Sequence, residues 1–309
     1  MQFRIHLLIA VCLLALCPWS ARAQTQANTD VERSDMMTTL TTQLAGPATG
    51  TIPDSPADPD LGDQRILVPD DRYKAFTLFS NISEFYTTNA ALSNGGEQSD
   101  WFTAMQFGAA WVPRITGNLF GEATALQQLF RYANLSGLSF NSLDLGAGLI
   151  YVVRELDDLS VFARYNYNLL TNASSDGSLF YQQTIRLGLN KPFVFSRAHS
   201  ANVGLVADFN LDGWPRYALR NRFALLTGYT ANLTRLLQAN LFYQIGYFPF
   251  VESSRQDLNQ LVSLGLTLNI HPRFSINTSV SGGFNSSTES FYSYSVLNTG
   301  VGVSANYRF

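Results

Sequence analysis

The sequence predicts an all-β protein whose antiparallel strands close into an up-and-down barrel across a membrane. Three observations support this prediction: few charged residues, apolar residues at every second position along most of the chain, and an export signal at the N-terminus. Of the 309 residues, 14% are charged and 13% are aromatic, whereas soluble domains carry about a quarter charged residues. Hydrophobic residues make up 46% of the chain, which excludes disorder over its whole length.

Residues 1–23 have the composition of a secretory signal peptide. Arg4 supplies a positive charge, Leu7 to Cys17 form an apolar core too short to span a bilayer as a helix, and Ala21 to Ala23 provide a small-residue cleavage site. We expect cleavage after Ala23. Both cysteines of the chain lie in this segment, so a disulfide framework in the exported protein is excluded. A lipid-modified Cys17 is the alternative, which the large Leu16 before it disfavours.

Residues 24–72 differ in composition from the rest of the chain. They contain nine acidic and three basic residues, five prolines and no aromatic residue. This composition is typical of a flexible, disordered segment without a core of its own, with a short helix expected only over Met36–Leu44. The net charge of the segment is −6. It either hangs in the periplasm or enters a basic barrel lumen as a plug.

From residue 73 to residue 309, apolar and polar side chains alternate with the period of two that β-strands require. Along residues 159–169, the odd positions are apolar or aromatic and most even positions are polar. Such segments are long enough to cross a bilayer as tilted strands of about 9–11 residues. About twelve strands are expected, over residues 73–87, 101–112, 118–131, 139–154, 159–170, 179–190, 201–211, 217–231, 236–248, 258–270, 274–284 and 296–309.

The connections between these segments alternate in length. Thr88–Asp100 and Pro249–Asp257 are long and polar, whereas Pro113–Gly117 is tight. Membrane barrels of bacteria have short periplasmic turns and longer outer loops, so we expect the long links on the outside and both chain ends on the inside. Two links do not fit the alternation, residues 191–200, which are too long, and Asp212–Arg216, which is too short.

The C-terminal strand, Val301–Phe309, alternates up to its final residue and carries aromatic side chains at Tyr307 and Phe309. This strand resembles the terminal assembly signal of bacterial outer-membrane β-barrel proteins. The resemblance implies a porin-like barrel over residues 73–309, located in the bilayer of the outer membrane. It also implies that the barrel-assembly machinery recognises Tyr307 and Phe309. It does not identify a subfamily.

Charged side chains are expected on the lumen face of the strands. An arginine lining favours anions in a pore. The alternative is that the arginines pair with the aspartates and fill a narrow barrel. A twelve-stranded barrel is intermediate in width between barrels that side chains fill and barrels that hold an aqueous channel, so the sequence is compatible with an open or a blocked lumen. The candidate pore-lining residues are Arg164, Arg186, Arg220, Arg222, Asp144 and Asp208.

Other classes of function lack support in the sequence. A pI of about 5.6 and the absence of a basic block exclude a nucleic-acid binder. No cofactor or zinc motif is present, and prolines around Asp58–Asp60 interrupt calcium-ligand spacing. Outer-membrane phospholipases, which are twelve-stranded enzymes, place a His and a Ser two residues apart on one strand face. Because His199 directly precedes Ser200 and His271 lies four residues before Ser275, we expect no enzymatic activity, cofactor or metal site.

The function that these observations favour is a narrow passive channel for small polar or anionic solutes. The main alternative is a non-conducting structural or adhesion barrel that acts through its outer loops, residues 88–100, 249–257 and 285–295. An outer-membrane lipid-modifying enzyme is a third, less favoured class. The sequence does not determine the solute or the oligomeric state.

Overall fold

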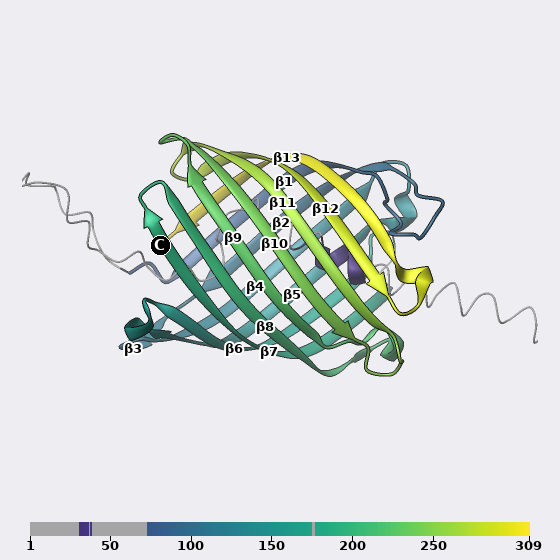
Figure 1. Ribbon diagram of the computed structural model, residues 1–309, viewed down its shortest axis with the longest axis horizontal. Coiled ribbons are helices and arrows are strands. Elements are labelled where there is room, and N and C mark those ends of the chain that lie inside the picture. Colours follow the sequence, from purple (N-terminus) through teal and green to yellow (C-terminus); the bar gives the residue numbers. More distant parts are fainter. Residues whose placement is uncertain (1–30, 37, 39–72, 175–176) are drawn as a thin grey trace, which may run out of the picture.

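The computed structural model describes residues 31–36, 38, 73–174 and 177–309. The predicted signal peptide, its cleavage site and most of the acidic segment lie outside the described residues. Twelve long antiparallel strands form a barrel (Figure 1). They are β1 (Phe76–Thr87), β2 (Asp100–Trp111), β4 (Leu119–Tyr132), β5 (Phe140–Val153), β6 (Leu159–Asn172), β7 (Ser178–Ser196), β8 (His199–Trp214), β9 (Arg222–Asn232), β10 (Leu237–Pro249), β11 (Gln256–His271), β12 (Phe274–Ser287) and β13 (Tyr294–Arg308).

The barrel is closed because β1 pairs with β13 as well as with β2. Each other long strand pairs with its neighbours in the chain, and β2 pairs directly with β4. The short strand β3 (Arg114–Thr116) only extends one edge of β4. The predicted twelve-stranded up-and-down barrel is therefore confirmed. Closure also removes the unpaired strand edges that lipid could not hydrogen-bond.

The two ends of the barrel differ in the length of their connections. At one end, the turn end, the links are residues 112–118, 154–158, 197–198, 233–236 and 272–273; at the other, the loop end, they are residues 88–99, 133–139, 173–177, 215–221, 250–255 and 288–293. Short 3-10 turns occupy parts of four links, at Ser136–Leu138, Arg154–Leu156, Arg216–Ala218 and Ser290–Tyr292. The backbones of Phe76 and Phe309 hydrogen-bond to each other at the turn end. The first strand therefore begins, and the last strand ends, at this end of the barrel.

The two links that did not fit the predicted alternation, residues 191–200 and 212–216, belong in part to strands. β7 continues through Pro192, which lies opposite Asn202, and only residues 197–198 separate β7 from β8. β8 in turn extends to Trp214, and the 3-10 turn Arg216–Ala218 delays the start of β9 until Arg222. The predicted strand 217–231 therefore began too early, and Arg220 lies in a loop-end link, where it forms an isolated bridge with Phe250.

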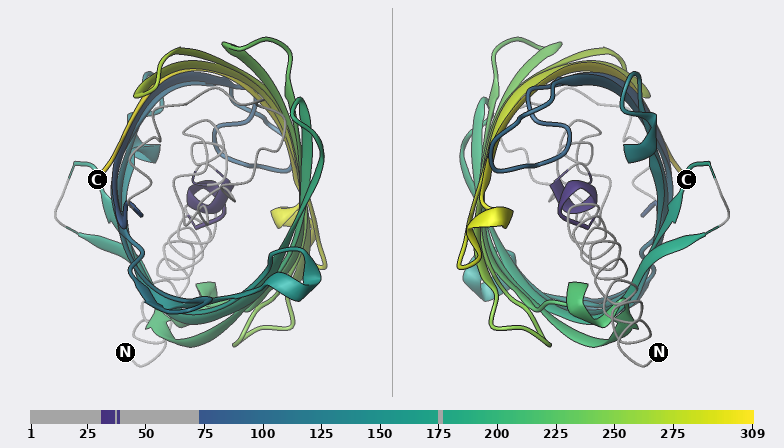
Figure 2. Two further views of the ribbon diagram at one scale, coloured as in Figure 1. Left: turned by 90° about the vertical axis from the view of Figure 1, so that its left-hand side faces the viewer. Right: turned by 90° about the vertical axis from the view of Figure 1, so that its right-hand side faces the viewer.

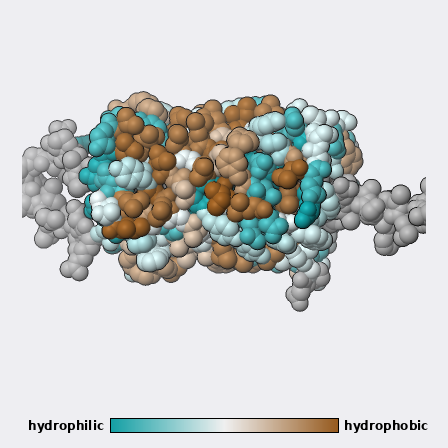
Figure 3. All heavy atoms as spheres, turned by 90° about the horizontal axis from the view of Figure 1, so that it is seen from below, coloured by the Kyte–Doolittle hydropathy of each residue, from teal (hydrophilic) through white to brown (hydrophobic). Residues whose placement is uncertain are grey.

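The outer face of the barrel is apolar and the inner face is polar. Leu, Ile, Val and aromatic side chains are exposed around the outside, as at Ile82, Leu149 and Val303, and they cover much of the face in Figure 3. Polar side chains such as Asn81 and Gln106 are buried inside. This distribution explains the low charge content and confirms a transmembrane barrel of the outer-membrane type. Among the described residues, no helix is long and apolar enough to cross a membrane.

Residues 31–36 and 38 are helical and lie inside the barrel (Figure 2, purple). We call them the lumen helix. Val31 and Met36 pack in an aromatic cluster at the loop end that includes Phe85, Phe130 and Phe140. The acidic segment was expected either in the periplasm or in the lumen, and these residues of it lie in the lumen. The helix begins before the expected range of Met36–Leu44, most of which lies outside the described residues.

Candidate functional site in the barrel lumen

A row of charged side chains crosses the inner wall from β4 to β9. The strand register places Glu122, Arg164, Arg186, Asp208 and Arg222 in this row, with Gly148 between the first two. We call it the charged row. Three of the predicted arginines belong to it. Strand register, rather than sequence proximity, therefore brings these charges together.

Two arginines of the charged row are paired with carboxylates of the wall itself. Arg164 reaches Glu122 with two guanidinium nitrogens, at 2.5 to 2.9 Å. Gly148 has no side chain to separate this pair, although its strand lies between theirs. Arg186 binds its direct cross-strand neighbour Asp208 at 2.6 and 2.9 Å. The pairing alternative is thus observed for these two arginines, but Asp144 takes no part in it.

Arg222 and Asp144 have neutral partners instead. The Nη2 of Arg222 donates a hydrogen bond to the Oε1 of Gln244 at 2.9 Å. Its buried Nε has no hydrogen-bond partner among the described residues. Asp144 accepts hydrogen bonds from Asn168 at 2.6 Å and Ser142 at 3.1 Å. Among the described residues, Arg222 is therefore the member of the charged row whose positive charge no carboxylate contacts.

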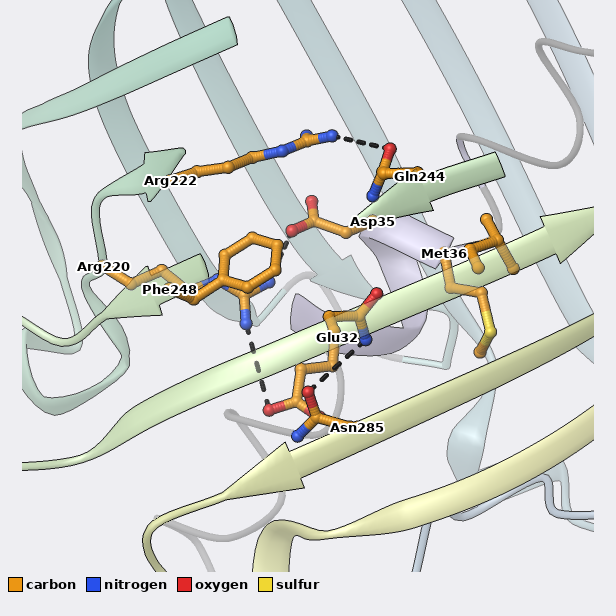
Figure 4. A pocket seen from close by; sticks show the side chains of 10 residues that line it. Glu32, Asp35, Met36, Arg220, Arg222, Gln244, Phe248 and Asn285 are labelled. Carbon is orange, nitrogen blue, oxygen red and sulfur yellow. Dashed lines mark hydrogen bonds and ion pairs between the residues drawn. The ribbon is translucent and has the colours of Figure 1, made fainter. Parts of the chain in front are cut away.

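Arg220 is paired with the lumen helix (Figure 4). Its Nη2 donates to Oδ2 of Asp35, and its Nη1 lies 3.9 Å from Oε1 of Glu32. Glu32 also accepts a hydrogen bond from Arg255, which is bonded in addition to Asp257. Burial raises the pKa of the Glu32 carboxyl to about 7, and Arg255 and Arg220 oppose this increase.

Aromatic rings hold the two helix-binding arginines. The guanidinium of Arg220 lies 4.5 Å from the ring centre of Phe248 and 5.9 Å from that of Phe250. The guanidinium of Arg255 lies 4.2 Å from the ring of Phe250 and 3.5 Å from that of Tyr292. Cation–π contacts of this kind are worth about 0.5–2 kcal/mol each. Aromatic rings of β10 and of the loop-end links therefore contact both guanidinium groups independently of the helix.

Further contacts anchor the lumen helix to the loop end. Arg33 lies over the ring of Tyr132 and donates to the carbonyl oxygen of Leu138 at 3.4 Å. Thr38 donates to the side chain of Gln128 at 2.7 Å. Polar, ionic and apolar contacts together make the helix a packed part of the lumen.

A cavity of about 420 Å³ lies beside the helix. Asp35 of the helix lines this cavity. All six predicted pore-lining side chains lie around it as well: Arg164, Arg186, Arg220, Arg222, Asp144 and Asp208. Its volume is in the range of small-molecule sites. That these residues line a conducting pore stays a prediction.

Four residues that shape this region were not among the predicted candidates. Glu122 follows the alternation of its strand, so its lumen-facing position was readable from the sequence. Arg255 lies in the link between β10 and β11, where no alternation of apolar and polar residues predicts whether a side chain faces the lumen. Glu32 and Asp35 belong to the acidic segment, whose net charge allowed a plug but whose pattern does not say which carboxylates enter the barrel.

The two histidines of the barrel, His199 and His271, occupy turn-end positions. Nδ1 of His199 lies 2.7 Å from the hydroxyl of Tyr229. Nδ1 of His271 accepts a hydrogen bond from the backbone N–H of Arg273 at 3.2 Å. Within the described part of the chain, no serine hydroxyl is bonded to either histidine, and no group of His, Cys, Asp and Glu side chains could hold a metal ion.

The two C-terminal aromatic residues lie on the outside of the barrel. Tyr307 and Phe309 are exposed, and their ring centres are 5.4 Å apart. Their predicted recognition by the barrel-assembly machinery stays a prediction.

Comparison with known proteins shows the fold. No family model matches the chain, and no curated protein matches it. A solved outer-membrane channel from Pseudomonas putida F1 is similar with a TM-score of 0.53 and 9% identity, over 78% of this chain and 100% of that chain. The channel DcaP of Acinetobacter baumannii gives a TM-score of 0.43 and 9% identity, over 75% and 96% of the two chains. At these identities the likeness concerns architecture alone. The predicted porin-like fold and outer-membrane location are confirmed.

Proposed function

We propose that this protein is a narrow channel for small polar or anionic solutes across the outer membrane. The observation that carries the proposal is the cavity inside the closed barrel, which is lined by four arginines. A membrane barrel with a polar interior supports passage of polar solutes. An arginine lining lowers the electrostatic barrier for anions.

Arg222 supports the preference for anions. Arg164 and Arg186 are neutralised by Glu122 and Asp208 of the wall, whereas Arg222 binds the neutral Gln244. An anion in the cavity would therefore meet an arginine that has no competing carboxylate in contact with it. A cation would meet Asp144, so the preference is expected to be moderate.

The lumen helix supports a low or gated conductance. Its buried residues fill space at the loop end of the barrel, where Val31 and Met36 pack among aromatic side chains. Its removal would widen the path beside the charged row. We therefore expect the full-length chain to conduct rarely or in small steps.

A non-conducting structural or adhesion barrel is the second candidate. The observation that favours it is that residues 88–99 are bonded to the neighbouring loop end: Asn94 donates to the carbonyl oxygen of Ser290, in the link 288–293, at 2.6 Å, and Asn89 donates to that of Ser295, at the start of β13, at 3.1 Å. Such contacts support an organised outer surface that a partner could bind.

Single-channel recording in a planar bilayer under a salt gradient tests the two candidates. The full-length chain and a variant lacking residues 24–72 are compared, with folding checked by heat-modifiable gel migration. Conductance steps with an anion-leaning reversal potential, larger in the truncated variant, are expected. Silence from both folded proteins would contradict the channel proposal and favour the structural barrel.

A further inference from the structure

Arg220 depends on the lumen helix for both of its carboxylate partners. Its side chain is 6% exposed, and its guanidinium contacts Asp35 and Glu32. No carboxylate of the barrel wall is within ion-pair distance of it in the described part of the chain. If the helix left, Arg164 and Arg186 would keep their partners, but Arg220 would lose both counter-ions while aromatic rings still cover part of its guanidinium, which is unfavourable.

Contacts with residues outside the lumen helix also hold Arg220, so its guanidinium can bind another ligand. Phe248 and Phe250 lie against its guanidinium, and Gln182 donates a hydrogen bond to its carbonyl oxygen at 2.9 Å. Arg222 lines the same small pocket of Figure 4, and its buried Nε has no hydrogen-bond partner in the part of the chain that the structure describes. The two guanidinium groups thus form a cationic site with unused donor capacity.

This site can be reached from the cavity. The 420 Å³ cavity is lined by Arg220, Arg222 and Asp35. The side chain of Asp35 is 48% exposed, whereas that of Glu32 is 4% exposed. A solute in the cavity can therefore approach Arg222 first and then compete with Asp35 for Arg220, while Glu32 lies deeper.

We propose that Arg220 and Arg222 form a binding site for small dicarboxylates, in which Asp35 and Glu32 of the lumen helix act as a built-in competitor. Glu32 and Asp35 are three residues apart, which puts their Cβ atoms about 5–6 Å from each other on one helix face. They contact different nitrogens of one guanidinium. A short molecule with two carboxylates can make the same contacts, because arginine binds carboxylates with paired, charge-assisted hydrogen bonds.

The proposal couples the solute to the helix. Because both occupy Arg220, a bound dicarboxylate weakens docking of the helix, and the docked helix weakens dicarboxylate binding by the same factor. A monocarboxylate replaces only one of the two contacts and has a smaller effect. The inference rests on the proposed channel function for the route of the solute, but binding itself can be measured without conduction.

Calorimetric titration of the folded, full-length protein with succinate tests the site. The double variant Glu32→Gln/Asp35→Asn removes the charge of the competitor, so we expect succinate to bind it at least tenfold more tightly than it binds the unaltered protein. Arg220→Gln should abolish this gain when added to the double variant. Glu155→Gln, a change of an exposed residue at the turn end, should bind succinate like the unaltered protein.

Recording of the same proteins separates the two proposals. Succinate should raise the open probability of the unaltered protein at least tenfold more than acetate does at equal ionic strength. Equal succinate affinity in the unaltered protein and the double variant, or an unchanged affinity after Arg220→Gln, would overturn the binding site. Conductance steps that do not respond to succinate would also overturn it while leaving the channel proposal intact. Silence of every variant would instead contradict the channel proposal, and calorimetry would still decide the site.

Discussion

Arg164 and Arg220 face the same lumen, but their carboxylate partners belong to different parts of the molecule. The partner of Arg164 is Glu122, which sits in the closed sheet. The partners of Arg220 are Asp35 and Glu32, which sit on the lumen helix outside the sheet. The first pair can separate only if the barrel distorts, whereas the second can separate if the helix moves.

This difference shows that the role of a buried ion pair depends on whether the carboxylate belongs to the barrel sheet or to the lumen helix. Losing one partner of a buried pair costs about 3–5 kcal/mol, because the remaining charge is left uncompensated. In a wall pair, this cost falls on the stability of the barrel. In a helix pair, it falls on the docking of the helix, and therefore on the width of the lumen.

The largest expected effect is on the wall. Arg164→Gln leaves the Glu122 carboxylate, whose side chain is 1% exposed, without its cation. We expect a loss of about 3–5 kcal/mol in the free energy of unfolding, measured by urea titration with heat-modifiable gel migration. The open probability of the channel should change little. If Arg164→Gln opened the channel without destabilising the barrel, the distinction between wall and helix pairs would fail.

The next effect is on the helix. Asp35→Asn should leave the barrel as stable as before but weaken helix docking by roughly 30- to 100-fold, since Arg220 loses the carboxylate bonded to it. This is less than the full cost of breaking a buried pair, because the side chain of Asp35 is half exposed. Single-channel recording should show a correspondingly higher open probability. Glu252→Gln is the matched control, because Glu252 forms an exposed pair with Arg216, and exposed pairs contribute little.

The docking of the helix is also expected to depend on pH. Burial raises the pKa of Glu32 from its usual value of 4.5 to about 7, beside Arg220, Arg255 and Asp257. The docked helix therefore binds a proton more tightly than the released helix does. Docking is favoured below pH 4.5 and weakens as the pH rises towards 7, so the open probability should rise roughly tenfold between pH 5.5 and pH 8.

Glu32→Gln is the control for this pH dependence, because it keeps the histidines of the barrel and removes only the proposed titrating group. Its open probability should be nearly flat over the same range. An equally steep profile in the variant would assign the titration to another residue.

The smallest effect is on ion preference. Arg222→Ser removes the arginine that has no carboxylate in contact with it, so the permeability ratio should shift towards cations by about two- to fivefold. The reversal potential under a salt gradient measures the shift. An unchanged reversal potential would show that Arg222 does not set the selectivity.

Much of the barrel was predictable because lipid and lumen impose alternation on every strand. The range 274–284 lies within β12, and 159–170 lies within β6. Pro192 misled the prediction because proline usually ends a central strand, yet β7 continues past it. Alternation also placed Arg164 and Arg186 on the inner face.

The ion-pair partners of the charged side chains were harder to predict than the face of the barrel on which each side chain lies. Glu122 and Arg164 are brought together by the register across β5, which a single sequence does not specify. Arg220 and Asp35 are 185 residues apart in the chain, and the acidic segment has no periodicity that could fix which of its carboxylates docks. The pairing that distinguishes the two classes of arginine is thus a product of tertiary structure.

A double-mutant cycle between Asp35 and Arg220 tests the central claim most directly. The open probability of the folded, full-length channel is recorded for Asp35→Asn, Arg220→Gln and the combined variant. If their contact holds the helix in place, each single change should raise the open probability, and the combined change should raise it little further, because coupled residues are non-additive. Effects that simply add, or single variants that conduct like the unaltered protein, would contradict the account.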